Sequence, residues 1–238
     1  MTALLARLCG AAVLALSLST AQAADVFTDA MQQAYAPYRA ALFRTNSGDQ
    51  AASAQAVAQA RQAWTAVRER FAGAAPAPYD RDPGFAATLA EVDAVYVRAV
   101  RQVAGGGLAE AHDTLEAIRD LLADLRRRNN VVVFSDAMNA YHAQMELVLQ
   151  RAPAWLSRPG DLPDLTAATG ALAYLARRLA DEAPPATRED PAFQSGLQAV
   201  QASVHALLTA VTAGDAAAAR VALGQLKKPY SQLFLKFG

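Results

Sequence analysis

One sequence pattern occurs twice in this chain, and the internal repeat constrains the fold more than any other feature. Residues 27–31 read FTDAM and return as FSDAM at 134–138, an offset of 107 residues (27 to 134). Residues 82–85 read DPGF and return as DPAF at 190–193, an offset of 108 residues (82 to 190). Apolar positions keep the same register, as in the pairs Leu89/Leu197, Val92/Val200, Leu115/Leu223, Ile118/Leu226 and Leu125/Leu233. We therefore predict a tandem duplication, with one unit at 24–129 and the other at 130–238.

The composition favours helices. The chain is rich in alanine, and only 7% of its residues are aromatic, which is unusual for a sheet protein. Each unit is predicted to hold four helices, at 26–44, 49–71, 83–103 and 108–128 in the first and at 134–151, 165–182, 191–213 and 215–237 in the second. Short connections between helices of similar length predict antiparallel neighbours. We therefore expect an all-α fold of two tandem up-down-up-down four-helix bundles.

Turn and cap residues mark the helix ends. Asp82-Pro83 and Asp190-Pro191 each predict an N-cap followed by proline at the first helical position. Residues 105–107 are three glycines, which predict a tight turn before the helix at 108–128. That helix carries an apolar stripe at Leu108, Ala111, Leu115, Ile118, Leu122 and Leu125.

The first residues have the pattern of an export signal. Arg7 precedes an apolar run at 8–18, and the small-residue triplet AQA follows at 21–23. This pattern predicts a secretory signal peptide at 1–23 and a periplasmic mature protein. Cys9 is the one cysteine of the chain and lies in this segment, so the mature protein is expected to have no disulfide, thiolate metal site or c-type haem attachment.

Charge and motifs exclude several functional classes. The 22 basic residues balance 22 acidic ones, so no basic surface for nucleic acid and no polybasic membrane patch is expected. We find no phosphate-binding glycine loop, nucleophile elbow or HExxH motif, which indicates a protein that is not an enzyme. Arg126, Arg127 and Arg128 end a predicted helix, where their charge complements the helix dipole.

Several segments resemble cytochrome b562, a periplasmic haem-binding four-helix bundle whose fold cytochrome c′ shares. They are the start of the first helix at 25–31, the loop that ends at 82–83, AVRQV at 99–103 with GLAEA at 107–111, and LKKPY at 226–230. The resemblance implies a bundle fold and a haem ligated by a methionine of the first helix and a histidine of the fourth.

The haem ligands that the resemblance implies are incomplete here. Met31 and Met138 occupy the methionine position of the two units, but Arg126 and Phe234 stand where the histidine is expected. Neither residue can ligate iron in that way, and the CxxCH motif of cytochrome c′ is absent. We therefore expect no haem, and we expect Met31 and Met138 to fill the core.

Two histidine–glutamate pairs suggest a metal site. His112 and Glu116 are four residues apart on one predicted helix, and His142 and Glu146 are four apart on the next, so each pair shares a helix face. If these helices are antiparallel about the turn at 128–130, both pairs are about the same number of residues from the turn. They would then lie at about the same level along the two helix axes. Two imidazoles and two carboxylates are suitable ligands for Zn²⁺, Cu²⁺ or Fe.

Nearby residues extend this hypothesis. Met138, His142 and Met145 share a helix face, and thioether with imidazole suits copper, so copper is slightly favoured. Asp113 and Asp136 are expected to accept hydrogen bonds from the imidazoles. Each His–Glu pair is equally interpretable as a surface pair, and His205 stands alone without neighbouring ligands.

The sequence leaves three functions open. The leading one is a periplasmic, non-enzymatic protein that binds, stores or delivers a transition metal. The second is a metal-free helical accessory module that docks on an envelope protein. The third is haem binding through unusual ligands.

Overall fold

The computed structural model describes residues 25–158 and 162–238, and the predicted signal peptide at 1–23 lies outside them. The described residues form helices and turns without any β-strand, so the predicted all-α class is confirmed. Within these two ranges, no helix combines the length and the apolar character that crossing a membrane requires.

The first half of the chain forms four long helices. They are α1 (Val26–Thr45), α2 (Gln50–Phe71), α3 (Phe85–Ala104) and α4 (Leu108–Arg128), and a short 3-10 helix, η1 (Tyr79–Arg81), lies in the loop before α3. The carboxylates of Asp25 and Asp49 accept hydrogen bonds from the first backbone N–H groups of α1 and α2. Gly106 has a φ of 85°, which the turn between α3 and α4 requires and glycine readily adopts.

The second half follows a similar order with two differences. Its elements are α5 (Phe134–Trp155), α6 (Leu162–Glu182), the short α7 (Pro185–Glu189), α8 (Pro191–Thr212), α9 (Ala216–Leu223) and α10 (Lys227–Phe237). The sequence pattern did not predict α7. The predicted last helix at 215–237 is divided into α9 and α10 by a turn at 224–226, because Pro229 has no N–H to continue the helical hydrogen bonds across it.

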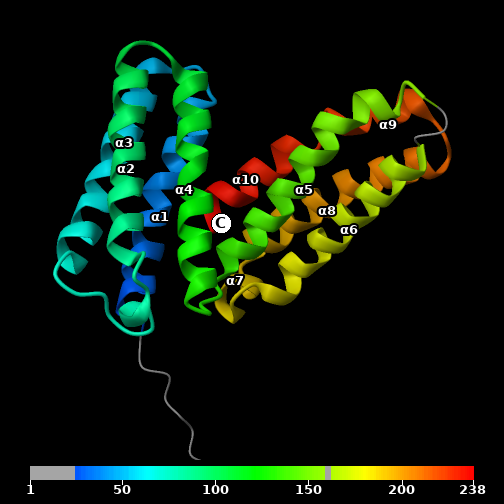
Figure 1. The fold of residues 1–238 in the computed structure, drawn as a ribbon. Coiled ribbons are helices and arrows are strands. Elements are labelled where there is room, and N and C mark those ends of the chain that lie inside the picture. The colour runs from blue at the N-terminus through cyan, green and yellow to red at the C-terminus, as the bar shows by residue number, and fades with distance from the viewer. Residues whose placement is uncertain (1–24, 159–161) are drawn as a thin grey trace, which may run out of the picture.

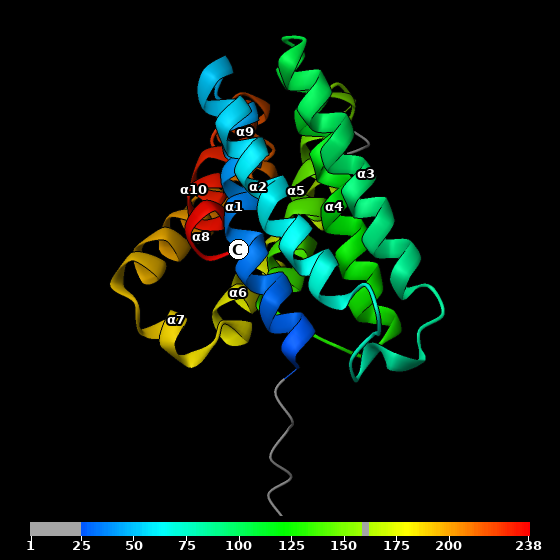
Figure 2. The same ribbon diagram turned by 90° about the vertical axis from the view of Figure 1, so that its left-hand side faces the viewer.

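The helices form two groups inclined to one another. Figure 1 shows α1 to α4 side by side, with α5, α6, α8, α9 and α10 in a second group that extends away from the end of α4. Helix α10 packs against α1 of the first group and against α5 and α8 of its own, as both views indicate (Figures 1 and 2). Buried apolar side chains from both groups make one continuous core.

The core uses the faces that the sequence pattern predicts. Of the stripe on α4, Ala111, Leu115, Ile118, Leu122 and Leu125 are all buried, and Leu108 is partly buried. Near the start of α1, the ring of Phe27 makes edge-on contacts with Phe71, Tyr79 and Phe85. These contacts attach the η1 loop to the core.

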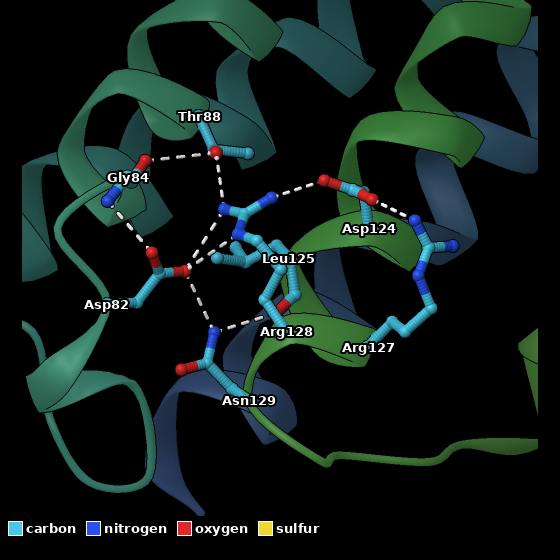
Figure 3. A network of polar contacts seen from close by, with 8 residues as sticks. All are labelled: Asp82, Gly84, Thr88, Asp124, Leu125, Arg127, Arg128 and Asn129. Atoms are coloured by element: carbon cyan, nitrogen blue, oxygen red, sulfur yellow. Dashed lines mark hydrogen bonds and ion pairs between the residues drawn. The ribbon is translucent and has the colours of Figure 1, made fainter.

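Asp82 does not cap a helix as predicted, whereas Asp190 caps α8. Helix α3 begins two residues later than expected, after Gly84, and the Asp82 carboxylate instead joins the network in Figure 3. It accepts hydrogen bonds from Arg128 at 3.0 Å, from the Asn129 amide at 2.9 Å and from the Gly84 N–H at 2.8 Å. The loop before α3 is thereby fixed to the C-terminus of α4.

The three arginines that end α4 do more than complement its dipole. Arg127 and Arg128 both form ion pairs with Asp124, and Arg128 also binds Asp82 (Figure 3). The side chain of Arg126 is completely buried and pairs with Asp136 at the start of α5. Arg126 therefore joins the two helical groups through an ion pair in which the arginine is buried and the aspartate is partly exposed.

Candidate metal site in the central cavity

A cavity of about 580 Å³ lies where the two helical groups meet, and we call it the central cavity. Its walls are residues of α1, α4, α5 and α10 and of the turn after α1. All four residues of the predicted His–Glu pairs line it: His112, Glu116, His142 and Glu146. The fold thus brings together two pairs that are far apart along the sequence.

The two imidazoles converge on one carboxylate. The Nε2 atom of His112 lies 3.7 Å from Oε1 of Glu116, and Nε2 of His142 lies 3.8 Å from the same oxygen. Nε2 of His142 is also 3.7 Å from Oε1 of Glu146. Ligands bound tetrahedrally to a metal at about 2.0–2.1 Å are about 3.3–3.4 Å from one another. The observed distances therefore exceed those of a closed metal site by a few tenths of an ångström.

The ring of His112 is held by its other nitrogen. Nδ1 lies 3.0 Å from the backbone carbonyl of Leu42 and 3.2 Å from the Thr45 hydroxyl. A carbonyl only accepts hydrogen bonds, so Nδ1 donates to it, and in the neutral form of the ring the lone pair is then on Nε2. A metal-bound histidine is usually oriented in this way. The Leu42 carbonyl has the role predicted for Asp113, which is exposed at the cavity wall.

His142 is held in its neutral form. Burial, with smaller contributions from the positive charges of Arg119 and Lys227 and from the neighbouring His112, lowers its pKa from 6.5 to about 3. Its ring lies against Tyr230, with 5.4 Å between the ring centroids. A neutral imidazole is the form that binds a metal, so His142 needs no deprotonation at physiological pH.

Two basic residues that the sequence analysis missed already neutralise the carboxylates. Nη2 of Arg119 lies 2.6 Å from Oε1 of Glu116, and Nζ of Lys227 lies 3.0 Å from Oε1 of Glu146. Arg119 is three residues from Glu116 on α4, so helix geometry could have revealed it, whereas Lys227 comes from α10 without a local signal. Among the described residues, no group of three or more His, Cys, Asp or Glu side chains has an arrangement that could hold a metal ion.

The remaining predicted residues lie in different places. Met145 lines the cavity, but Met138 is completely buried and is not part of its wall. Asp136 is not an imidazole partner because its carboxylate binds Arg126 at 3.1 Å through Nε. His205 is exposed on α8 and contributes nothing to the cavity.

The positions that resemble haem ligands in the first unit are in contact. Nη1 of Arg126 donates to the sulfur of Met31 at 3.7 Å, so the guanidinium lies against the methionine side chain. Both side chains are buried. This contact fills the core at that position with a cation that cannot ligate iron.

Comparison with known proteins gives no assignment. A scan against protein-family models matches none of them, and searches of the curated proteins and of the solved structures return no significant match.

Proposed function

We propose that this chain binds one divalent transition metal ion in the central cavity and serves to bind, store or deliver it without catalysis. The proposal rests on one observation: Nε2 of His112 and Nε2 of His142, from different helices, both lie within 3.8 Å of one Glu116 oxygen. Glu146 is the fourth ligand in this proposal. Two nitrogens and two oxygens suit Zn²⁺ and Cu²⁺.

The charge of the cavity supports a cation as its ligand. Four carboxylates line it, from Asp113, Glu116, Asp120 and Glu146, against the cations Arg39, Arg119 and Lys227. Arg39 is engaged elsewhere, since its Nε donates to the Leu235 carbonyl at 3.2 Å at the end of α10. An added divalent cation therefore meets an excess of negative charge.

Closing the site requires the ligands to move and to exchange their present partners. Each imidazole must approach Glu116 by a few tenths of an ångström, Glu116 must exchange Arg119 for the metal, and Glu146 must exchange Lys227 for it. The ligands come from two helical groups, so binding is expected to hold α4 and α5 together and to stabilise the folded protein.

The compartment and the ancestry of the chain belong to the same proposal. The signal-peptide pattern at 1–23 supports export to the periplasm, and copper is a plausible cargo there, with Met145 at the cavity wall. The repeat at offsets of 107 and 108 residues supports a tandem duplication of a four-helix bundle. The contact between Arg126 and Met31 supports a cytochrome b562-like bundle that carries no haem.

Isothermal titration of metal-free mature protein with Zn²⁺ and with Cu²⁺ tests the proposal. We expect one ion per chain, with affinity reduced at least tenfold in His112→Ala and in His142→Ala. His205→Ala is the matched control and should bind like the wild type, because His205 is exposed on α8. Absence of binding, or an affinity that is unchanged in both His112→Ala and His142→Ala, would favour the metal-free accessory module instead.

A further inference from the structure

The central cavity is much larger than the proposed metal requires. Its volume of about 580 Å³ falls within the range of pockets that hold small organic molecules, roughly 300–1,000 Å³. A bare ion with its four side-chain ligands takes up a small part of that space. The remainder is available to a second component beside the metal.

Arg119 has unused hydrogen-bonding capacity at the cavity wall. Its side chain is only 9% exposed, and its Nη2 donates to Glu116 at 2.6 Å. Among the described residues, its Nη1 and Nε have no hydrogen-bond partner, and neither atom belongs to the buried unpartnered groups, so both donors remain accessible to solvent. A buried guanidinium with free donors is suited to a carboxylate, which accepts two parallel N–H bonds.

Two further polar groups near the cavity have no partner. The amide of Asn139, which lines the cavity, has both its nitrogen and its oxygen buried without a hydrogen bond among the described residues. The hydroxyl of Tyr35 is also buried without a hydrogen bond among the described residues, but Tyr35 does not line the cavity. Burial raises the pKa of the Tyr35 hydroxyl, and the nearby Asn139 side chain offsets part of this rise. No hydrogen bond of good geometry joins the two groups. Buried polar groups normally find partners, so an absent ligand is a physical explanation for the unpaired Asn139 amide.

We propose that the cavity binds its metal together with a small organic carboxylate, which accepts hydrogen bonds from Arg119 and contacts the Asn139 amide. The inference rests on the proposed metal site, because the carboxylates of the empty cavity outnumber its cations and repel an anion. A bound divalent ion reverses that balance and attracts the carboxylate.

Titration with succinate, with uncharged succinamide as the matched ligand, tests this inference. Zn²⁺-loaded protein should bind succinate at least tenfold more tightly than metal-free protein does, and it should not bind succinamide. Arg119→Gln should weaken succinate binding at least tenfold while retaining the metal, and the exposed Arg101→Gln is its charge-matched control. Metal analysis after each titration checks that succinate has not removed the ion.

Variants of the unpartnered groups give a second readout. Asn139→Leu should lose succinate binding and raise the melting temperature of the ligand-free protein. Tyr141→Phe is the control and should bind succinate like the wild type, because the Tyr141 hydroxyl is buried and unpartnered among the described residues but Tyr141 does not line the cavity.

The outcomes separate this inference from the metal proposal. If Zn²⁺ binds but succinate does not, or if Arg119→Gln and Asn139→Leu leave succinate binding unchanged, the carboxylate site is overturned and the metal site stands. If Zn²⁺ itself does not bind, the proposed function fails, and this inference fails with it.

Discussion

At the scale of single residues, Lys227 occupies a position beside Glu146 that a bound metal would take. Its Nζ lies 3.0 Å from the Glu146 carboxylate, and its charge is among the causes of the low pKa of His142. Lys227 would therefore compete with a metal ion for the Glu146 carboxylate. A metal must displace it before Glu146 can become a ligand.

Replacing this competitor should tighten metal binding. In Lys227→Gln, the Glu146 carboxylate is free and one positive charge is removed, so we expect roughly three- to tenfold higher affinity for Zn²⁺ by isothermal titration. Lys228→Gln is the matched control, since Lys228 follows Lys227 in the chain, is exposed and does not line the cavity. Equal affinities in the two variants would show that Lys227 does not compete.

His142 predicts a specific dependence of stability on pH in the metal-free protein. Between its unfolded pKa of 6.5 and its folded pKa of about 3, the unfolded chain binds the proton and the folded chain does not. The free energy of unfolding therefore falls as the pH decreases through this window, by about 1–2 kcal/mol between pH 7 and pH 5. Urea denaturation at several pH values should show this loss in the wild type.

The variant His142→Gln separates this effect from other titrating groups. Its stability should depend less on pH, by about the same 1–2 kcal/mol over that interval, because no imidazole remains to be protonated on unfolding. His205→Gln should behave like the wild type. If the curves of wild type and His142→Gln are parallel, the imidazole is not held neutral by burial.

The candidate ligands could be chosen from the sequence because they follow local geometry. The spacing of four residues puts His112 with Glu116 and His142 with Glu146, and counting from the turn at 128–130 gives both pairs one height. The contacts of Leu42, Thr45 and Asn139 could not be predicted in the same way. They depend on how α1 and α5 pack across the cavity, which no short pattern specifies.

At the scale of structural elements, Asp82 fixes the loop before α3 to the end of α4. Burial opposes ionisation of its carboxyl, but hydrogen bonds from Asn129, Gly84 and Arg128 together hold its pKa below the usual value. Arg128 also donates to the Thr88 hydroxyl at 3.1 Å, so the network extends into the first turn of α3 (Figure 3).

Removing that carboxylate should destabilise the first helical group. Asp82→Ala leaves the Asn129 amide and the Gly84 N–H without their shared acceptor, and we expect a loss of about 1–3 kcal/mol in the free energy of unfolding. Asp80→Ala removes an exposed carboxylate from the same loop and should change stability by less than about 0.5 kcal/mol. Urea denaturation with matched m-values would measure both, and similar losses would argue against the network.

Most helix ends could be predicted because local residues determine them. Asp190 followed by Pro191 begins α8, and the glycines at 105–107 separate α3 from α4. The pattern was misleading at Asp82, where tertiary partners attract the carboxylate away from a capping role. It was also misleading at 224–226, where the apolar spacing continues but Pro229 interrupts the backbone hydrogen bonds.

At the scale of the whole molecule, the ion pair between Arg126 and Asp136 joins the two helical groups. The arginine side chain is fully buried, whereas that of Asp136 is 27% exposed and also accepts a hydrogen bond from the Val133 N–H at 3.1 Å. If one partner is removed, water can therefore hydrate the remaining Asp136 carboxylate more easily than the remaining Arg126 guanidinium.

This difference predicts unequal effects of removing each partner. Asp136→Ala leaves a buried guanidinium without its counter-ion and should cost about 3–5 kcal/mol of unfolding free energy. Arg126→Met should cost less, because the remaining carboxylate reaches water and the methionine can pack on Met31. Urea denaturation measures both, with exposed Asp181→Ala as the control. A larger loss in Arg126→Met would contradict this account of the junction.

The relative placement of the two groups could not be predicted from the repeat. A duplication specifies two similar units, but it does not specify the angle between them. That angle depends on the Arg126–Asp136 pair and on the packing of α10 against α1, which join residues far apart in the sequence. The central cavity is a consequence of that angle.

Anomalous diffraction from crystals of the Zn²⁺-loaded protein, measured on either side of the zinc absorption edge, tests the central claim most directly. We predict one anomalous peak per chain, at about 2.0–2.1 Å from Nε2 of both His112 and His142, with Glu116 as a third ligand. A peak elsewhere, such as at His205, or no peak in the central cavity at full zinc loading, would contradict the account.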